Sequence, residues 1–274
     1  GSRLRHPDLL ERKGTAVKFV RSFCMALAMY SKLPVPQVEW REENMAYAMC
    51  FFPVIGACIG LLMFAVLALA NLLALSRTLT AALLTVLPLA VTGGIHMDGF
   101  CDVADALSSH APKEKKLEIM KDPRAGAFAV IACGAYLLLT FGLWNDASLG
   151  EADCVALALC PVLSRGLSAL AVVTFRGARR DGLLAAFRDA SDIRVVRVVS
   201  LLWIAAAAGM MLLRAPIAGG AAVAAAGLSF LYYRLMSYRE FGGATGDLAG
   251  YFVQVCELAC LSAVVLVGKI GGLL

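Results

Sequence analysis

Long apolar runs follow one another along most of the chain, with only short polar segments between them. A helix needs roughly 20 apolar residues to cross the hydrocarbon core of a bilayer, and several runs reach that length. The composition agrees, because 60% of the 274 residues are hydrophobic and 16% are charged, against roughly 45–50% and 25% in soluble domains. The sequence therefore predicts an all-α, polytopic membrane protein.

The apolar runs are accounted for by seven transmembrane helices in one integral membrane domain, residues 1–274. We place the spans at residues 45–75, 79–95, 126–144, 153–174, 196–213, 216–236 and 250–268. Lysine and arginine collect on the cytoplasmic side of membranes. The four segments that share a side with the N-terminus carry 21 of the 25 such residues: 1–44, 96–125, 175–197 and 234–249. This bias predicts a cytoplasmic N-terminus.

Two segments outside the spans have an interfacial character. Residues 1–44 form a cytoplasmic or interfacial N-terminal segment, in which Val17–Tyr30 is expected to be an interfacial or re-entrant helix that ends before Lys32-Leu-Pro-Val-Pro36. Residues 181–188 are expected to form an amphipathic segment. The arginines around it suit a lipid surface as well as a substrate.

A cluster of acidic residues directly follows the second span. Asp98, Asp102 and Asp105 are spaced by four and three residues, which places them on one face of a helix, with His96 two residues earlier. Three like charges on one face repel each other, and oxygen-only ligands suit a hard divalent cation, Mg²⁺ first. The alternative is an acidic helix face in water. The cluster predicts a metal site at the cytoplasmic end of the span.

The loop before the third span offers basic residues. Asp122 and Pro123 have the residue types of an N-cap and a first helical position, which predicts that the third span starts there. A helix start flanked by Lys121 and Arg124 suits an anion such as phosphate. The alternative is ordinary positive charge flanking a span.

Two charged residues fall inside predicted spans. Arg165 lies near the middle of the fourth span, where a charge is costly and marks a function, a helix–helix salt bridge or a side chain that reaches the interface. Glu257 in the last span needs a partner, for which Arg165, a metal or a substrate amide would serve. Asp247 ends a glycine-rich turn, residues 242–247, just before that span.

Together these features are typical of a phosphoryl-transfer site, where catalysis is mostly positioning and neutralisation of charge. Mg²⁺ on Asp98, Asp102 and Asp105 would bridge a pyrophosphate, while Lys121 and Arg124 would stabilise the leaving group. His96 is the nearest group to accept a proton from an attacking hydroxyl. It serves equally well as a partner that orients a carboxylate.

The stretch Thr92-Gly-Gly-Ile-His-Met-Asp-Gly-Phe-Cys-Asp-Val-Ala-Asp105 resembles the signature of the cobalamin synthase family, adenosylcobinamide-GDP ribazoletransferase. Further stretches resemble that family in the same order: Lys32-Leu-Pro-Val-Pro36, Phe52-Pro-Val-Ile-Gly56, Ile119-Met-Lys-Asp-Pro-Arg-Ala-Gly-Ala-Phe128, Leu163-Ser-Arg165 and Gly242-Gly-Ala-Thr-Gly-Asp247. The resemblance covers residues 20–260. Gln254 departs from it, because an acidic residue is common there in the family.

The resemblance implies a reaction and its partners. A ribose hydroxyl of α-ribazole, or of its 5′-phosphate, attacks the pyrophosphate of adenosylcobinamide-GDP; GMP leaves, and adenosylcobalamin or its phosphate forms with Mg²⁺ as cofactor. The expected surroundings are the inner, cytoplasmic membrane and its lipid bilayer, with the active site facing the cytoplasm. No nucleic acid is expected as a partner. Association with a second copy or with other enzymes of cobalamin synthesis stays open.

Two other functions compete with this one. A CDP-alcohol phosphotransferase also displaces a nucleoside monophosphate, but its Asp-x-x-Asp-Gly-x-x-Ala-Arg pattern is not met, because Ile95 stands three residues before Asp98 and no Ala-Arg follows Gly99. A transporter would use Arg165 and Glu257 as coupling charges. Most polar residues instead gather at one face of the predicted bundle, which favours the transferase.

Overall fold

The computed structural model describes residues 7–147, 150–179 and 182–271, with side chains from residue 17 onward apart from Leu183. Its helices are α1 (Pro7–Tyr30), α2 (Glu42–Met45), a 3₁₀ turn η1 (Ala48–Phe51), α3 (Phe52–Leu72), α4 (Arg77–Thr92), α5 (Ile95–Ser108), α6 (Lys113–Ile119), α7 (Ala127–Asp146), α8 (Glu151–Thr174), α9 (Leu183–Ala190), α10 (Ile193–Arg214), α11 (Pro216–Met236), a π-helical turn η2 (Ser237–Phe241) and α12 (Gly246–Gly271). No strand occurs in the described ranges, so the all-α prediction is confirmed.

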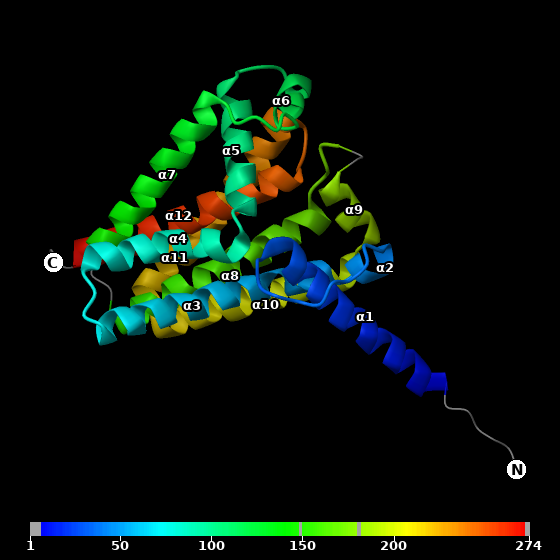
Figure 1. The fold of residues 1–274 in the computed structure, drawn as a ribbon, viewed down its shortest axis with the longest axis horizontal. Coiled ribbons are helices and arrows are strands. Elements are labelled where there is room, and N and C mark those ends of the chain that lie inside the picture. The colour runs from blue at the N-terminus through cyan, green and yellow to red at the C-terminus, as the bar shows by residue number, and fades with distance from the viewer. Residues whose placement is uncertain (1–6, 148–149, 180–181, 272–274) are drawn as a thin grey trace, which may run out of the picture.

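Six stretches of this bundle are long and apolar enough to cross a membrane by themselves: residues 42–72, α7, α8, α10, α11 with η2, and α12. The predicted second span is the exception. α4 has 16 residues and is long enough to cross a membrane only together with α5, from which it is bent by 96°. The remaining predicted spans agree with the observed helices to within a few residues. Figure 1 shows α3, α4, α8 and α10 running along one direction while α5 crosses it.

The bend between α4 and α5 is made by two glycines. Gly93 has φ of 66° and ends α4, and Gly94 has φ of 80° and precedes α5. Residues with a Cβ rarely adopt such left-handed conformations. At Gly93 a Cβ would also collide with the side chain of Lys32. The Gly-Gly pair therefore ends the apolar span and turns the acidic segment away as a separate helix.

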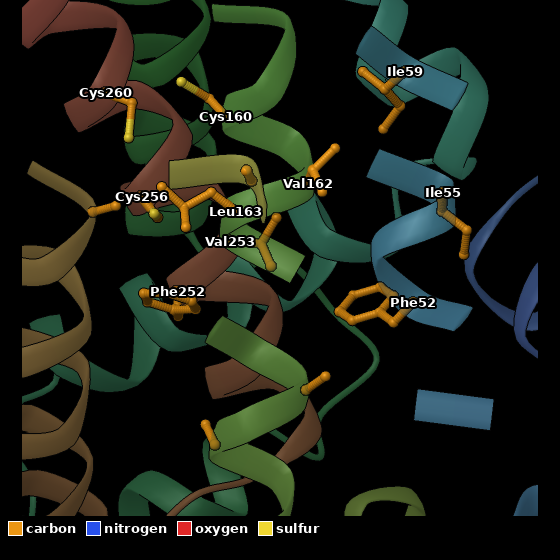
Figure 2. Close-up of a cluster of buried hydrophobic side chains, with 14 of the residues drawn as sticks. Phe52, Ile55, Ile59, Cys160, Val162, Leu163, Phe252, Val253, Cys256 and Cys260 are labelled. Carbon is orange, nitrogen blue, oxygen red and sulfur yellow. The ribbon is translucent and has the colours of Figure 1, made fainter. Parts of the chain in front are cut away.

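The core of the bundle lies where α3, α8 and α12 pack together. Figure 2 shows Phe52 and Ile55 of α3, Val162 of α8 and Val253 and Cys256 of α12 around it, and all five are at most 4% exposed. α8 is buried along most of its length, because 78% of its most apolar 18-residue stretch lies inside the protein. It is therefore the central helix, and the polar groups it carries face protein rather than lipid.

The four polar segments predicted to share one side of the membrane meet at one end of the bundle. Lys116 forms an ion pair of 2.5 Å with Glu240, and Arg179 donates to the carbonyl oxygen of Leu117. The start of α10 joins them, because the backbone N–H of Asp192 donates to the carbonyl directly after α2. These contacts place the segments at one end of the bundle, in agreement with the predicted grouping.

Helix ends meet at the opposite end of the bundle as well. Lys269 near the end of α12 forms an ion pair of 2.8 Å with Asp146 at the end of α7. Arg77 at the start of α4 donates to the carbonyl of Ala147 at 2.5 Å. The long helices therefore run between two polar ends, as transmembrane helices do (Figure 1).

The predicted N-cap of the third span is wrong. Neither Asp122 nor Pro123 caps a helix, and α7 begins four residues after Pro123, at Ala127 with Gly126 before it. The carboxylate that satisfies its first N–H groups comes from another helix: Asp105 of α5 accepts from the backbone of Gly126 at 2.6 Å and of Ala129 at 2.8 Å. The sequence predicted a cap from the residues just before the helix, whereas the structure uses a carboxylate from a different helix.

Candidate functional site

The acidic helix α5 crosses the first turns of α12 at very short range. A Cβ on Gly99 would lie 2.7 Å from the carbonyl oxygen of Asp247, and one on Gly250 would lie 3.2 Å from the backbone of His96. Small residues let two helix backbones approach in this way. The crossing brings Asp98 of α5 and Asp247 of α12 to one place, although 149 positions separate them in the numbering.

A cavity of about 670 Å³ opens beside this crossing. His96, Asp98 and Asp247 line one side of it, and Tyr30, Phe52 and Phe187 contribute aromatic surface. Ligand pockets typically have volumes of about 300–1,000 Å³ and combine apolar walls with a few polar groups. The cavity thus joins His96 and Asp98 with Asp247 in one candidate active site, and the charges of both acids act on Asp102 beside it.

Asp102 lies among other carboxylates of this site. Asp102, on α5 outside the six apolar stretches, has a pKa raised to about 7 by burial and then by the negative charges of Asp98, Asp247 and Asp105. A cation among these groups would relieve that repulsion. In the described ranges, no three acidic, histidine or cysteine side chains stand close enough to enclose a metal by themselves.

Asp105 differs from the other two acids of α5. Both of its carboxylate oxygens accept a backbone N–H at the start of α7. Of the three acids of α5, Asp98 alone lines the cavity. A carboxylate at a helix N-terminus satisfies unpaired N–H groups and interacts favourably with the helix dipole. Asp105 therefore holds α5 against α7, a role that the sequence did not predict.

His96 lies deep beside the cavity. Its side chain is 4% exposed, its ring stands 6.2 Å from that of Tyr30 and 5.6 Å from that of Phe52, and its Nε2 has no hydrogen-bond partner within the described part of the chain. Burial, and then the positive charge of Arg165, hold the pKa of His96 well below its usual value. The imidazole is therefore neutral at physiological pH and does not hydrogen-bond to a carboxylate of the described residues.

Arg165 forms a salt bridge between helices, one of the alternatives considered for it. Its Nη1 lies 2.5 Å from Glu257 Oε1, and Ser164 donates to the same oxygen at 2.9 Å. Arg165 is 1% exposed and its guanidinium lies 5.8 Å from the ring centre of Phe52. Arg165 and Glu257 do not line the large cavity. They stand behind its wall, joining α8 to α12.

The predicted anion-binding residues of the loop before α7 stand apart from the cavity. Neither Lys121, Asp122 nor Arg124 lines it. Arg124 is paired with Asp122 by a two-point contact of 2.7 and 2.9 Å and is 86% exposed. These hydrogen bonds lower the pKa of Asp122 to about 2. The structure brings together His96, Asp98, Asp102 and Asp247, but not these three.

The arginines that line the cavity come instead from α9 and from the segment that follows α8. Arg176 and Arg179 follow α8, in a segment that runs beside the glycine-rich turn through backbone hydrogen bonds of 2.9 Å between Arg176 and Ala244 and between Ala244 and Ala178. Arg188 of α9 lies on the same wall. The cavity therefore has an acidic side on α5 and α12 and a basic side on α9 and the segment before it.

A comparison with known protein families shows to which family the chain belongs. The family model described as cobalamin-5-phosphate synthase matches residues 22–265. The chain belongs to the cobalamin-5-phosphate synthase family. No solved structure gives a significant match.

Named members of the cobalamin-5-phosphate synthase family align over nearly their whole length. A protein named adenosylcobinamide-GDP ribazoletransferase from Lachnoclostridium phytofermentans is 46% identical over 250 residues, 91% of this chain and 95% of that protein. Proteins of the same name from Clostridium botulinum strain Alaska E43 and Pseudomonas fluorescens SBW25 are 32% and 33% identical, and the alignments cover 88% and 87% of this chain and 95% and 97% of theirs. The resemblance seen in the motifs is confirmed.

The departure of this chain from the cobalamin-5-phosphate synthase pattern lies away from the acidic residues. Gln254 is 5% exposed and lines, with Glu257, a small interior pocket of about 50 Å³ between the helices. It does not line the large cavity. The position that the sequence singled out as a departure therefore lies outside the candidate active site.

Sequence reasoning missed the arginines of the cavity in this cobalamin-5-phosphate synthase family member. Arg176, Arg179 and Arg188 were judged as suited to lipid as to substrate, whereas Lys121 and Arg124 were preferred because they flank a predicted helix start. No signal in the sequence separated the two alternatives, because Phe187 on a short amphipathic helix suits a lipid interface as well as packing on protein. Phe187 is 1% exposed.

Proposed function

We propose that this chain transfers α-ribazole, or its 5′-phosphate, to adenosylcobinamide-GDP, releasing GMP and forming adenosylcobalamin or its 5′-phosphate. Membership of the cobalamin-5-phosphate synthase family supports this, as do relatives named for the reaction. The observation that carries the proposal is the α5–α12 crossing, which brings His96, Asp98 and Asp247 to one cavity. A nucleotide-releasing transfer needs such a combination of acids, a neutral base and a large cavity.

The donor set fits Mg²⁺ as the cofactor. Asp98 and Asp102 would hold it, with Asp247 beside them, because their mutual repulsion favours a cation. Mg²⁺ commonly needs one or two protein carboxylates and takes its other ligands from substrate phosphates and water. When bound, it supplies positive charge to the pyrophosphate. Asp105 would support this site through its contacts with α7.

Residues of the chain account for the proton and for the positions of the groups. A ribose hydroxyl of the acceptor would attack the phosphorus that carries cobinamide, forming a new P–O bond as the P–O bond to GMP breaks. The unpartnered Nε2 of His96 would accept the hydroxyl proton. Asp98 and Asp247 would orient the pyrophosphate with its cation, and the aromatic wall would exclude water from the reacting groups.

We place this site at the cytoplasmic face of the inner membrane, because the end of the bundle that holds the cavity carries most lysines and arginines. Single cysteines test the orientation. His110→Cys should react with a membrane-impermeant thiol reagent from the cytoplasmic side, and Arg214→Cys from the outside, relative to the unsubstituted protein. The opposite pattern would reverse the orientation and leave the chemistry of the site untouched.

The activity is tested by incubating the purified protein in detergent or nanodiscs with adenosylcobinamide-GDP, α-ribazole or its 5′-phosphate, and Mg²⁺. We expect GMP and the matching cobalamin in equal amounts, and neither after chelation of the metal. Transfer to CDP-activated lipid alcohols under the same conditions should be absent. Release of CMP from such a substrate, with no GMP from adenosylcobinamide-GDP, would instead support the phosphotransferase alternative.

A further inference from the structure

The basic wall of the cavity consists of three arginines that converge from two segments. Arg176 and Arg179 lie on the segment after α8, and Arg188 lies on α9. Arg188 reaches back to that segment, because its Nη1 would lie 4.0 Å from a Cβ on Gly177. Arg188 thus stands beside the segment that carries Arg176 and Arg179, on the wall of a cavity large enough for a substrate.

Arg176 and Arg179 have protein partners. Arg176 donates to the carbonyl of Gly242 at 3.0 Å and its guanidinium lies 5.5 Å from the ring centre of Tyr238. Arg179 donates to the carbonyl of Leu117 and lies within electrostatic range of Asp247. Their guanidinium groups are therefore held in place by the fold.

Arg188 is different, because it forms no hydrogen bond or ion pair within the described part of the chain. It is half-buried. Asp189 also lines the cavity, but it is exposed and adjacent residues of a helix do not face each other. Phe187, the residue before Arg188, packs against Tyr30 with 6.4 Å between ring centres. The helix is therefore anchored while its guanidinium keeps all its donors for a ligand.

The chemistry of this wall suits a phosphate. A guanidinium donates two parallel hydrogen bonds to phosphate oxygens, and Arg176 and Arg179 add positive charge beside Arg188. The cavity therefore offers two distinct places for phosphate. One is the acidic side, where a pyrophosphate would arrive with its cation, and the other is Arg188. Figure 1 shows α9 and α5 on different sides of the bundle end.

The two acceptors of the proposed reaction differ by one phosphomonoester, and the donor's pyrophosphate is accounted for by the acidic side. We propose that Arg188 binds the 5′-phosphate of α-ribazole 5′-phosphate and makes the enzyme prefer the phosphorylated acceptor over α-ribazole. This rests on the proposed transfer reaction and adds to it a residue that determines acceptor specificity.

The test compares kcat/KM for both acceptors, at saturating adenosylcobinamide-GDP, in the wild type, Arg188→Ala, Arg188→Lys and the control Arg194→Ala. Arg194 is an exposed arginine at the start of α10 that does not line the cavity. For Arg188→Ala we expect a fall of about 10- to 100-fold with the phosphorylated acceptor, the effect of losing hydrogen bonds to a charged group, and a change within about twofold with α-ribazole. Arg188→Lys should recover part of the preference.

The outcomes separate the possibilities. An equal loss with both acceptors, or a raised KM for adenosylcobinamide-GDP, would assign Arg188 to the donor and overturn the inference. Unchanged kinetics in Arg188→Ala would overturn it as well. GMP release by the wild type shows independently that the proposed reaction occurs. Its absence with both acceptors would overturn the proposed function and this inference with it. If Arg188→Ala fails to fold, the same comparison is made with Arg188→Gln.

Discussion

The acidic and basic sides of the cavity are built in opposite ways. On the acidic side, His96, Asp98 and Asp102 lie within seven positions of one helix, and a glycine crossing adds Asp247. On the basic side, Arg176, Arg179 and Arg188 come from a loop segment and a separate helix, and they converge only in the folded chain. A short motif therefore reveals one half of the site, while the other half depends on tertiary packing.

Substitutions on the acidic side of the cavity are expected to have the largest effect on activity. Asp98→Asn or Asp102→Asn keeps the shape of the side chain but removes the charge that holds the cation. Either should lower transfer at least about a thousandfold, ~4 kcal/mol in the barrier. GMP release by purified, folded variants checks this. Full activity in the double variant would remove the metal assignment.

The Arg165–Glu257 pair behind the cavity should contribute more to stability than the charged residues on the acidic and basic sides of the cavity. Arg165→Ala leaves Glu257 without its cation in the interior, which should cost about 3 kcal/mol and lower the thermal unfolding midpoint in detergent. Lys113→Ala, at an exposed side chain, is the matched control. Equal small shifts in the two variants would show that the buried pair contributes little.

Within α5, substitutions at Asp105 should affect stability more and activity less than those at Asp98. Asp105→Ala removes both hydrogen bonds to the start of α7, and we expect a loss of about 1–2 kcal/mol in stability, the usual scale of a lost helix cap. Activity should fall much less than in Asp98→Asn. If Asp105→Asn abolished transfer as completely as Asp98→Asn, Asp105 would act as a metal ligand, as the spacing of the motif first predicted.

The smallest effect is expected outside the cavity. Arg124→Ala breaks an exposed pair with Asp122, and exposed pairs contribute at most about 1 kcal/mol. We expect kcat/KM to stay within about twofold of the wild type, whereas Arg179→Ala should lower it about tenfold or more. The reverse order would show that the loop before α7 closes over the substrate and forms part of the site.

The fold could be predicted to the extent that it follows from local chain properties. Apolar length located six of the spans, and the bias of lysine and arginine identified which polar segments meet at one end. The 96° bend was not predicted, because Gly93 and Gly94 permit a turn without fixing its angle, and α5 packs across α12 only in the folded chain. The cap of α7 was assigned wrongly for a similar reason, since its capping carboxylate comes from Asp105, 21 residues earlier.

The site was predictable where chemistry is concentrated in sequence. Asp98, Asp102 and His96 could be named because they fall within ten residues of an apolar chain. Three acids so close together repel each other, and polar side chains resist burial unless a ligand compensates them. Arg165 and Glu257 were recognised as unusual, and only packing shows that they satisfy each other. The arginines could not be ranked, because a basic loop beside a membrane has the same sequence whether it faces lipid or substrate.

The acidic side of the cavity is proposed to hold a divalent cation together with the donor pyrophosphate. Electron paramagnetic resonance of Mn²⁺, used in place of Mg²⁺, measures this directly in the presence of adenosylcobinamide-GDP and without acceptor. We predict a bound Mn²⁺ signal in the wild type and in Arg194→Ala, and its loss in the Asp98→Asn/Asp102→Asn double variant. Equal Mn²⁺ binding by the wild type and the double variant would contradict the account.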